Sequence, residues 1–432
     1  MKKYICQISD KFFATTSFIL IILLILSMPM TYFVKAFSIY NIHKDLLNLF
    51  ETIIQLFVFL YILKFLFSEK FHEIHLTSWD KFFLYLLIWA SISAFLAVDK
   101  ELAFMGTNYR VEGLTTYFCY ASIYICTKFI HDSFHKKCII WTFLGSISLL
   151  STMSLVQAWP ALMNALGEIG KNLYGTGITT VIFSGIFLNP NHYAYMLTIT
   201  ILGLAALFVF SKGFLSILFL VLYGFNLWAL IVNKTFGAYL AVIIGLLFFL
   251  LLLFMKKKTF IFKWLILLIL FCAISLGCQM NGSGKTEKDF ATLQNDMETL
   301  SENESAGNGR MALWKQALKY TLEQPIFGHG PEGLYHLYLD DGFLNDRPHN
   351  EYLQMAAFHG IPALCMYLGG LLSLLIYCIK NLKKLPNEYI IIGCMIFGYC
   401  ISAFFGNTMY YTTPYFYLFL GTLSTCKTEL DT

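Results

Sequence analysis

Long apolar runs recur along almost the whole chain, and short polar segments separate them. Several runs reach the roughly 20 residues that a helix needs to cross a hydrocarbon core about 30 Å thick. A transmembrane β-barrel would instead show segments of about ten residues in which apolar and polar side chains alternate, and the chain lacks this pattern. The pattern therefore predicts an all-α, polytopic membrane protein.

The apolar runs predict about twelve transmembrane helices, nine before a long polar segment and three after it. They lie near residues 13–34, 46–67, 82–98, 114–130, 139–158, 191–210, 214–232, 238–255, 260–277, 361–379, 389–405 and 411–425. The chain thus divides into a first membrane part (1–277), a loop (278–360) and a second membrane part (361–432). Composition agrees, because only 13% of the residues are charged, against about 25% in soluble domains.

The lysines and arginines predict which side of the membrane each loop faces, because short cytoplasmic loops are enriched in both. With a cytoplasmic N-terminus, 18 of the 30 basic residues fall in the inner segments, 6 in the short outer loops and 6 in residues 278–349. We therefore expect both termini in the cytoplasm and the long loop on the outer face of the cytoplasmic membrane.

Arginine is rare in the chain and is confined to segments expected outside. There are 27 lysines but only three arginines, Arg110, Arg310 and Arg347. A lysine supplies a point charge, whereas the planar guanidinium of arginine binds phosphate or carboxylate through two parallel hydrogen bonds. The three arginines are therefore candidates for binding an anion at the outer face.

The long loop changes character part-way along. Residues 278–308 are polar, mixed in charge and poor in aromatics, which is typical of a flexible linker. From Arg310 the apolar positions recur at helical spacing, with Asn308 as the expected N-cap and Pro325 as the stop. A second, shorter helix is expected to end near Leu339. Residues 309–360 are thus the expected helical part of the loop, and the candidate catalytic residues described next lie within it.

The loop ends in Arg347-Pro348-His349-Asn350, followed by a short helical stretch and Gly360. Proline before a helix and glycine after it are start and stop signals, so His349 and Asn350 are expected at the helix N-terminus. That end offers free backbone N–H groups and a positive dipole. A neutral histidine there can accept a proton near pH 7 while the N–H groups and arginines hold phosphate. The alternative is a histidine that only caps the helix.

Three further outer loops hold candidate residues. Arg110 and Glu112 precede a helix and could bind an anion. Asn189-Pro190-Asn191-His192 predicts a turn and a helix start, with His192 facing the outer mouth, and a purely structural cap is the alternative. Lys234 either contacts substrate or extends its ammonium to the membrane surface. No Cys-x-x-Cys occurs and the loop histidines and acids lack metal-ligand spacing, so neither a metal nor a cofactor is expected.

With these residues the chain resembles the bacterial O-antigen ligases and O-antigen polymerases, membrane glycosyltransferases that use lipid-linked glycans. Such ligases carry an outer-loop His followed by Asn, Ser or Gln, nine residues and then Gly, as His349-Asn350 and Gly360 do here. Arg310, Trp314 and the stretch 325–330 (Pro-Ile-Phe-Gly-His-Gly) are similar to the family's Arg, Trp and Pro-x-x-Gly-x-Gly run.

Two outer loops extend the resemblance, and two positions depart from it. Asn189-Pro190-Asn191 is typical of the family, and the segment from Gly106 to Gly113 resembles its arginine-bearing first loop. In contrast, Ala363 stands where ligases often have Gly, Thr or Tyr. Many members also have Ser-Arg-Gly before span eight, where this chain has Thr235-Phe236-Gly237, so that Lys234 can replace that arginine only in part.

The resemblance implies a GT-C-like fold and a metal-independent, inverting transfer of a glycan from a polyprenyl pyrophosphate, such as undecaprenyl pyrophosphate. It implies that His349 deprotonates the acceptor hydroxyl. Arg310 would be catalytic, and the pyrophosphate and glycan would lie against further residues: Arg110, Arg347, Asn350, Lys234, Asn191 and His192. The partners would be the lipid-linked donor, a glycan or lipid acceptor and membrane lipid, not nucleic acid. Polymerase and ligase remain open, as do the sugar and the acceptor.

Two other functions compete with a glycosyltransferase. A transporter or flippase of lipid-linked oligosaccharide would favour charged residues inside the spans and an internal repeat. The predicted spans are nearly free of acidic residues and we find no repeat, which favours the enzyme. A structural or sensory membrane protein remains possible only if all three arginines are replaceable.

Overall fold

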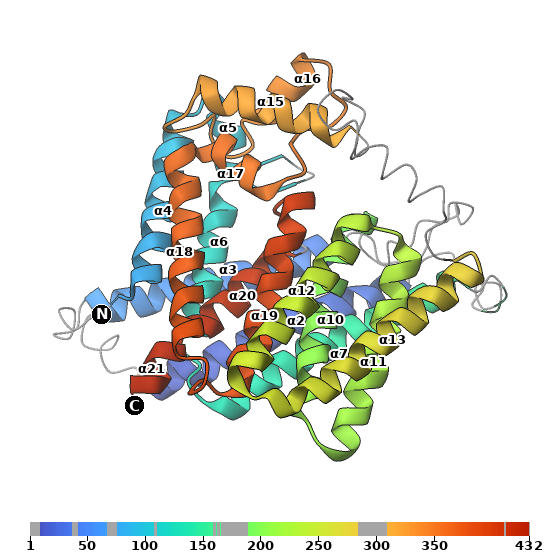
Figure 1. Ribbon diagram of the computed structural model, residues 1–432. Coiled ribbons are helices and arrows are strands. Elements are labelled where there is room, and N and C mark those ends of the chain that lie inside the picture. The colour runs from blue at the N-terminus through green and yellow to red at the C-terminus, as the bar shows by residue number, and fades with distance from the viewer. Residues whose placement is uncertain are drawn as a thin grey trace.

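The computed structural model describes residues 9–36, 42–66, 76–107, 110–158, 161, 165, 189–283, 309–409 and 412–431 (Figure 1). All regular elements within these residues are helices. Long helices form a bundle, and four shorter helices gather at one end of it: α5 (Lys100–Met105), α15 (Arg310–Glu323), α16 (Leu334–Asp340) and α17 (Glu351–His359). The predicted all-α class is confirmed.

Nine spans in the described part of the chain are long and apolar enough to cross a membrane. They comprise α2 (Asp10–Ala36), α3 (Ile42–Leu66), α4 (Ser78–Leu96), α10 (Pro190–Phe210), α11 (Gly213–Asn233), α12 (Phe236–Lys256), η2 (Lys258–Phe260) with α13 (Ile261–Met280), α18 (Ile361–Lys380), and α19 (Asn387–Ser402) with η3 (Ala403–Phe405). Each coincides with one of the twelve predicted spans. The protein is therefore a polytopic membrane protein, as predicted.

The other three predicted spans correspond to helices of different lengths. α7 (Ser133–Ala158) has 26 residues, but α6 (Leu114–Thr127) has 14 and α20 (Thr413–Ser424) has 12. The last two are shorter than the roughly 20 residues that a spanning helix needs. A total of twelve spans remains a prediction.

α10 lies at the centre of the bundle, with 94% of its span buried by neighbouring helices. α11, α12 and α19 pack around it. A Cβ atom added at Gly245 on α12 or at Gly398 on α19 would lie 2.4 Å from a methyl carbon of Leu202 on α10. Small residues thus let α12 and α19 approach α10 closely, as is common between membrane helices.

The helices of the long loop have a small apolar core of their own, which includes Leu313, Tyr320, Leu334, Tyr338 and Phe358. α16 and α17 agree with the predicted helices, and α15 begins at Arg310 as expected. Its N-cap is Gly309, with φ +78° and no side-chain hydrogen bond, so the predicted cap by Asn308 is wrong. Most of the predicted linker, residues 284–308, lies outside the described residues.

Residues 325–330 cross the end of α17 at close range. Gly330 N donates to Phe358 O at 2.8 Å, and Ile361 N donates to Pro325 O at 2.8 Å. Trp89 on α4 donates through Nε1 to the carbonyl oxygens of Ile326 (3.1 Å) and His359 (3.0 Å). The predicted proline, glycine and histidine motifs therefore meet at one crossing, which attaches α17 to the bundle.

Gly360→Ala is expected to destabilise this crossing. Gly360 has φ +86°, and an added Cβ would lie 2.0 Å from Ile326 O. We expect a loss of about 2 kcal/mol or more, because a left-handed residue and an overpacked contact each cost about 1–3 kcal/mol. The measurement is thermal unfolding in detergent. Gly342→Ala is the control, because Gly342 has φ +82° but open space around the added Cβ. Equal losses in both variants would contradict a packing role.

Candidate active site

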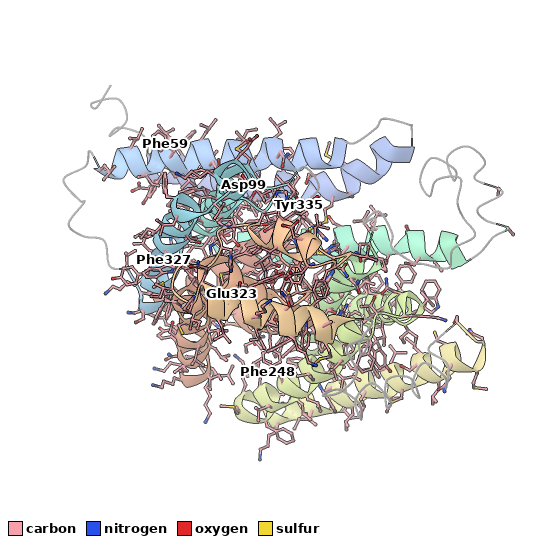
Figure 2. All side chains as sticks on the ribbon, turned by 90° about the horizontal axis from the view of Figure 1, so that it is seen from above. Phe59, Asp99, Phe248, Glu323, Phe327 and Tyr335 are labelled. Atoms are coloured by element: carbon pink, nitrogen blue, oxygen red, sulfur yellow. The ribbon has the colours of Figure 1, made fainter. Side chains whose placement is uncertain are left out.

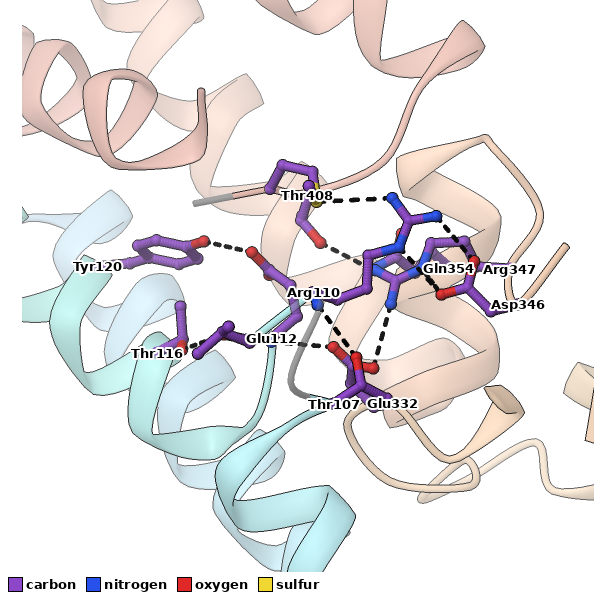
Figure 3. Close-up of polar contacts among 12 residues, drawn as sticks. Thr107, Arg110, Glu112, Thr116, Tyr120, Glu332, Asp346, Arg347, Gln354 and Thr408 are labelled. Carbon is purple, nitrogen blue, oxygen red and sulfur yellow. Dashed lines mark hydrogen bonds and ion pairs between the residues drawn. The ribbon is translucent and has the colours of Figure 1, made fainter. Parts of the chain in front are cut away.

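Loops from distant parts of the chain meet beneath the four short helices. Viewed from above, α15, which carries Glu323, and α16, which carries Tyr335, lie across the middle of the bundle (Figure 2). Below them meet the loop before α6, the loop before α17 and the segment between η3 and α20 (Figure 3). This region contains most of the predicted site residues.

Asp346 holds two of the three arginines. Arg110 donates through Nε to Asp346 Oδ2 (3.1 Å) and through Nη2 to Oδ1 (2.9 Å), and Arg347 Nε donates to Oδ2 (3.0 Å) (Figure 3). Burial alone would raise the pKa of Asp346, but the charges of Arg347 and Arg110 outweigh it and hold that pKa well below its usual range. The carboxylate is therefore ionised and fixes the plane of Arg110.

Arg347 points into the protein and is only 1% exposed. Its Nη2 lies 3.2 Å from Oε2 of Glu332, which is 0% exposed. Glu332 Oε1 in turn accepts a hydrogen bond from Glu112 N at 2.9 Å. Burial disfavours the Arg347 cation, but Asp346 and Glu332 outweigh burial and raise its pKa above the ordinary value. Arg347 therefore connects three loops.

Glu112 lies under the same loops and is fully buried. Tyr120 donates its hydroxyl to Glu112 Oε1 at 2.6 Å. Burial raises the pKa of Glu112 to about 8, so most of this carboxyl is protonated at neutral pH. Of the two residues predicted to bind an anion at the start of α6, Glu112 is therefore turned inward, and Arg110 is the candidate that remains.

His349 has left-handed backbone geometry, with φ +51°, and is partly exposed. Asn407 Nδ2 donates to its Nδ1 (3.1 Å), and its Nε2 lies 3.3 Å from Asn345 Oδ1. An amide nitrogen only donates, so the neutral ring carries its hydrogen on Nε2 and its lone pair on Nδ1. Burial, followed by the charges of Arg310 and Arg110, lowers the pKa of His349 to about 4. The ring is therefore neutral at pH 7.

Asn350 caps α17. Its Oδ1 accepts from Tyr352 N (3.0 Å) and from Leu353 N (3.1 Å). The predicted helix N-terminus is therefore confirmed. The expectation that its free N–H groups hold phosphate is wrong for these two groups, because the Asn350 side chain already occupies them.

Arg310 differs from the other two arginines. It is the first residue of α15, partly buried, and it makes no ion pair with any residue that the structure describes. Burial lowers its pKa from the ordinary value, and the hydroxyl of Tyr195 on α10 lies near enough to act on it. Its charge also acts on His349. Arg310 is thus a cation whose charge acts on His349 and whose guanidinium has no carboxylate partner among the described residues.

The structure also describes the two predicted residues at the start of α10, Asn191 and His192. Asn189 is the N-cap, and its Oδ1 accepts from Asn191 N at 2.8 Å, so the predicted turn and helix start are confirmed. His192 is buried, so the prediction that it faces the outer mouth is wrong. The charges of Arg110 and Arg347 nevertheless act on its ring, as does His349.

Lys234 lies apart from the other candidates. It ends α11 with left-handed geometry, φ +62°, and its side chain is exposed. Within the described residues it makes no contact with the arginines or with His349. A substrate contact by Lys234 remains a prediction.

Residues 218–368 match the family model described as O-Antigen ligase. This part of the chain is similar to O-antigen ligases. The matched range begins in α11, ends in α18 and contains Arg310, Arg347 and His349. No curated protein matches the chain. The match supports a role in cell-surface polysaccharide biosynthesis and suggests a glycan-transferring enzyme. It also implies a lipid-linked glycan and an acceptor as partners in general.

The candidate site contains residues that the sequence did not suggest. Asp346 and Glu332 could not be found from the sequence because their partners lie far away in the chain. An aspartate directly before an arginine, as Asp346 stands before Arg347, is nevertheless a signal that the sequence offers. Asn407 lies in a polar stretch between two apolar runs, which was another signal. Glu351 accepts hydrogen bonds from Tyr367 (2.9 Å) and Tyr399 (2.8 Å), and burial raises its pKa to about 7.

Among the described residues, no group of three His, Cys, Asp or Glu side chains is positioned to hold a metal ion.

Proposed function

We propose that this protein transfers a glycan from a polyprenyl-pyrophosphate donor to an acceptor hydroxyl at the outer face of the cytoplasmic membrane. The observation that carries the proposal is a neutral histidine, His349, on which the charge of Arg310 acts, while Arg310 itself has no carboxylate partner among the described residues. The histidine is suited to accept a proton and the guanidinium to hold a phosphate. Polymerase and ligase activity both fit this arrangement.

In the proposed reaction, Arg310 and Arg110 bind the pyrophosphate of the donor. The bond between the sugar anomeric carbon and the pyrophosphate oxygen breaks, and the electron pair leaves with the pyrophosphate. The acceptor oxygen forms the new bond and gives its proton to His349. A single displacement of this kind inverts the anomeric carbon. The two arginines supply the positive charge that the leaving group requires, so the proposal includes no metal ion.

The hydrogen bonds of His349 suggest how an acceptor binds. The lone pair on Nδ1 now accepts from Asn407. An acceptor hydroxyl that donates to Nδ1 would take over this hydrogen bond, and Asn407 would then be free to contact the sugar. The negative charge of a bound pyrophosphate would offset the arginine charges that lower the pKa of His349, so the base would become stronger once the donor is bound.

The other predicted site residues receive different roles in this proposal. Arg347 and Asn350 hold the loop before α17, because one is buried between carboxylates and the other caps the helix. Asn191 is partly exposed at the start of α10 and would face the glycan, whereas His192 is buried and is assigned no substrate contact. The proposed orientation places both termini in the cytoplasm, and the C-terminus lies at the end of the bundle opposite α15 (Figure 1).

A deletion strain complemented with variants tests the function. We expect the strain to accumulate lipid-linked glycan on the outer leaflet, and the wild-type gene to clear it. Arg310→Ala should lower transfer by about 10²–10³-fold, as expected when one preorganised donor to a developing anion is lost. The matched control is Lys315→Ala, an exposed cation on the same helix, which should restore transfer. Accumulation on the inner leaflet would instead indicate a flippase and contradict the proposal.

A further inference from the structure

α18 and α19 follow one another in the chain but pack against different neighbours. α18 packs chiefly against α4 and α17, whereas α19 packs against α10, α12 and α20. In Figure 1, α18 accordingly stands beside α4, and α19 lies with α12 and α20. The two consecutive helices therefore diverge and leave space between them.

A cavity of about 470 Å³ occupies this space. Leucines and isoleucines of α18 and α19 form its two sides, and Phe248 of α12 contributes a third. On α18 its wall extends from Leu368 to Ile379, which is about 16 Å at 1.5 Å per residue, or roughly half of the hydrocarbon thickness. Leu368 and Leu372 in the wall are 42% and 55% exposed, whereas Leu374 is buried. The cavity is thus deep on one side and open on the side that faces lipid.

The two tyrosine hydroxyls of the cavity wall are already hydrogen-bonded to other groups. Tyr352 donates its hydroxyl to Cys400 O at 2.7 Å. The hydroxyl of Tyr389 accepts from Lys136 Nζ (2.6 Å) and bonds Thr425 Oγ1 (2.9 Å). These two tyrosines therefore present ring surface to the cavity, and an apolar chain suits the lining better than a polar ligand.

One end of the cavity reaches the candidate active site. Tyr352 lines the cavity and lies in the first turn of α17, three residues after His349. Its ring centroid is 4.5 Å from that of Phe404, in the segment that leads to Asn407. An apolar chain in the cavity would therefore have its head group beside His349 and Asn407.

We propose that the cavity between α18 and α19 binds the isoprenoid tail of the donor, with the attached pyrophosphate at Arg310 and His349. This inference rests on the proposed function, which supplies a donor with a polyprenyl tail. The cavity holds only the part of the tail next to the pyrophosphate, because it covers about half of the membrane thickness. The remainder of the tail extends through the open side into the bilayer.

Gly393 on α19 offers a direct test. It lines the cavity, and a Cβ added there meets no atom within 4 Å, so Gly393→Phe fills the cavity without a clash at its first carbon. The control is Gly277→Phe on α13, because a Cβ at Gly277 also meets nothing within 4 Å and Gly277 does not line the cavity. The full-length protein is reconstituted in vesicles with undecaprenyl pyrophosphate that carries a photoreactive diazirine near the pyrophosphate.

We expect the wild-type protein to be labelled on α18 and α19, and unlabelled undecaprenyl pyrophosphate to compete for the labelling. Gly393→Phe should lower labelling tenfold or more, and Gly277→Phe should leave it unchanged. Equal competition by phosphatidylglycerol would show a general lipid cavity and overturn the inference, as would labelling confined to other helices. The proposed function is tested by a different experiment. If the deletion strain accumulates no lipid-linked glycan, the proposed donor class is wrong, whatever the result of the labelling experiment.

Discussion

His349→Ala is expected to lower glycan transfer by about 10²–10⁴-fold, the usual cost of removing a general base. The protein should remain folded in the membrane, because the ring is partly exposed and, among the described residues, its hydrogen bonds go to Asn345 and Asn407. The measurement is glycan transfer in reconstituted vesicles at equal protein content. His336→Ala is the control, because this loop histidine has a side chain that is 61% exposed. Unchanged transfer in His349→Ala would exclude this residue as the base.

The pH dependence of the reaction gives a second readout for His349. Burial, followed by the charges of Arg310 and Arg110, lowers its pKa to about 4 in the unliganded site. The base acts in its neutral form, so activity is present above this pKa and is lost as the pH falls through it. The acid limb of kcat/KM, which reports the free enzyme, should therefore lie near pH 4. The acid limb of kcat should lie at higher pH, because bound pyrophosphate offsets the arginine charges. Coincident limbs would contradict this role of the arginines.

Local sequence patterns were sufficient to predict the class of the protein and the helices of the long loop. Apolar runs identified nine spans because hydrophobic length alone decides whether a helix can cross a bilayer. Proline and glycine bounded α17 because each restricts the backbone at a known position. His349 was found in the same way, since its place follows from the helix start directly after it.

Pairings between distant loops could not be predicted from the sequence. Arg110 and Asp346 are separated by 236 positions, and Asn407 lies 58 positions after His349. For this reason Arg347 was predicted to contact substrate, although it faces Glu332 inside the protein. The residue type alone shows that all three arginines are able to bind an anion. Only the fold shows which of them already form ion pairs with carboxylates of the protein.

Hydropathy also overestimated the length of two predicted spans. α20 is buried along nearly its whole length, and it packs against α6. A helix that is surrounded by other helices is apolar whether or not it crosses the bilayer. The apolar runs near 114–130 and 411–425 therefore predicted burial correctly, but their helices are shorter than expected.

Arg347→Met is expected to cost about 3–5 kcal/mol of stability, as is typical when one member of a buried ion pair is removed. Methionine keeps most of the apolar stem but leaves Glu332 buried without its cation, and Asp346 keeps only Arg110. The measurement is unfolding in detergent, read as a fall in Tm. Lys319→Met on α15 is the control, because this lysine is exposed and should be replaceable at almost no cost.

The double variant Arg347→Met with Glu332→Gln separates the charge from the rest of the side chain. Glutamine still accepts from Glu112 N but no longer carries a buried negative charge, so a substantial part of the lost stability should return. Transfer should then recover in parallel with stability, because Arg347 is proposed to hold the loop rather than to contact the donor. If the double variant is stable but remains inactive, the guanidinium itself binds substrate, and the role predicted for Arg347 from the sequence is correct.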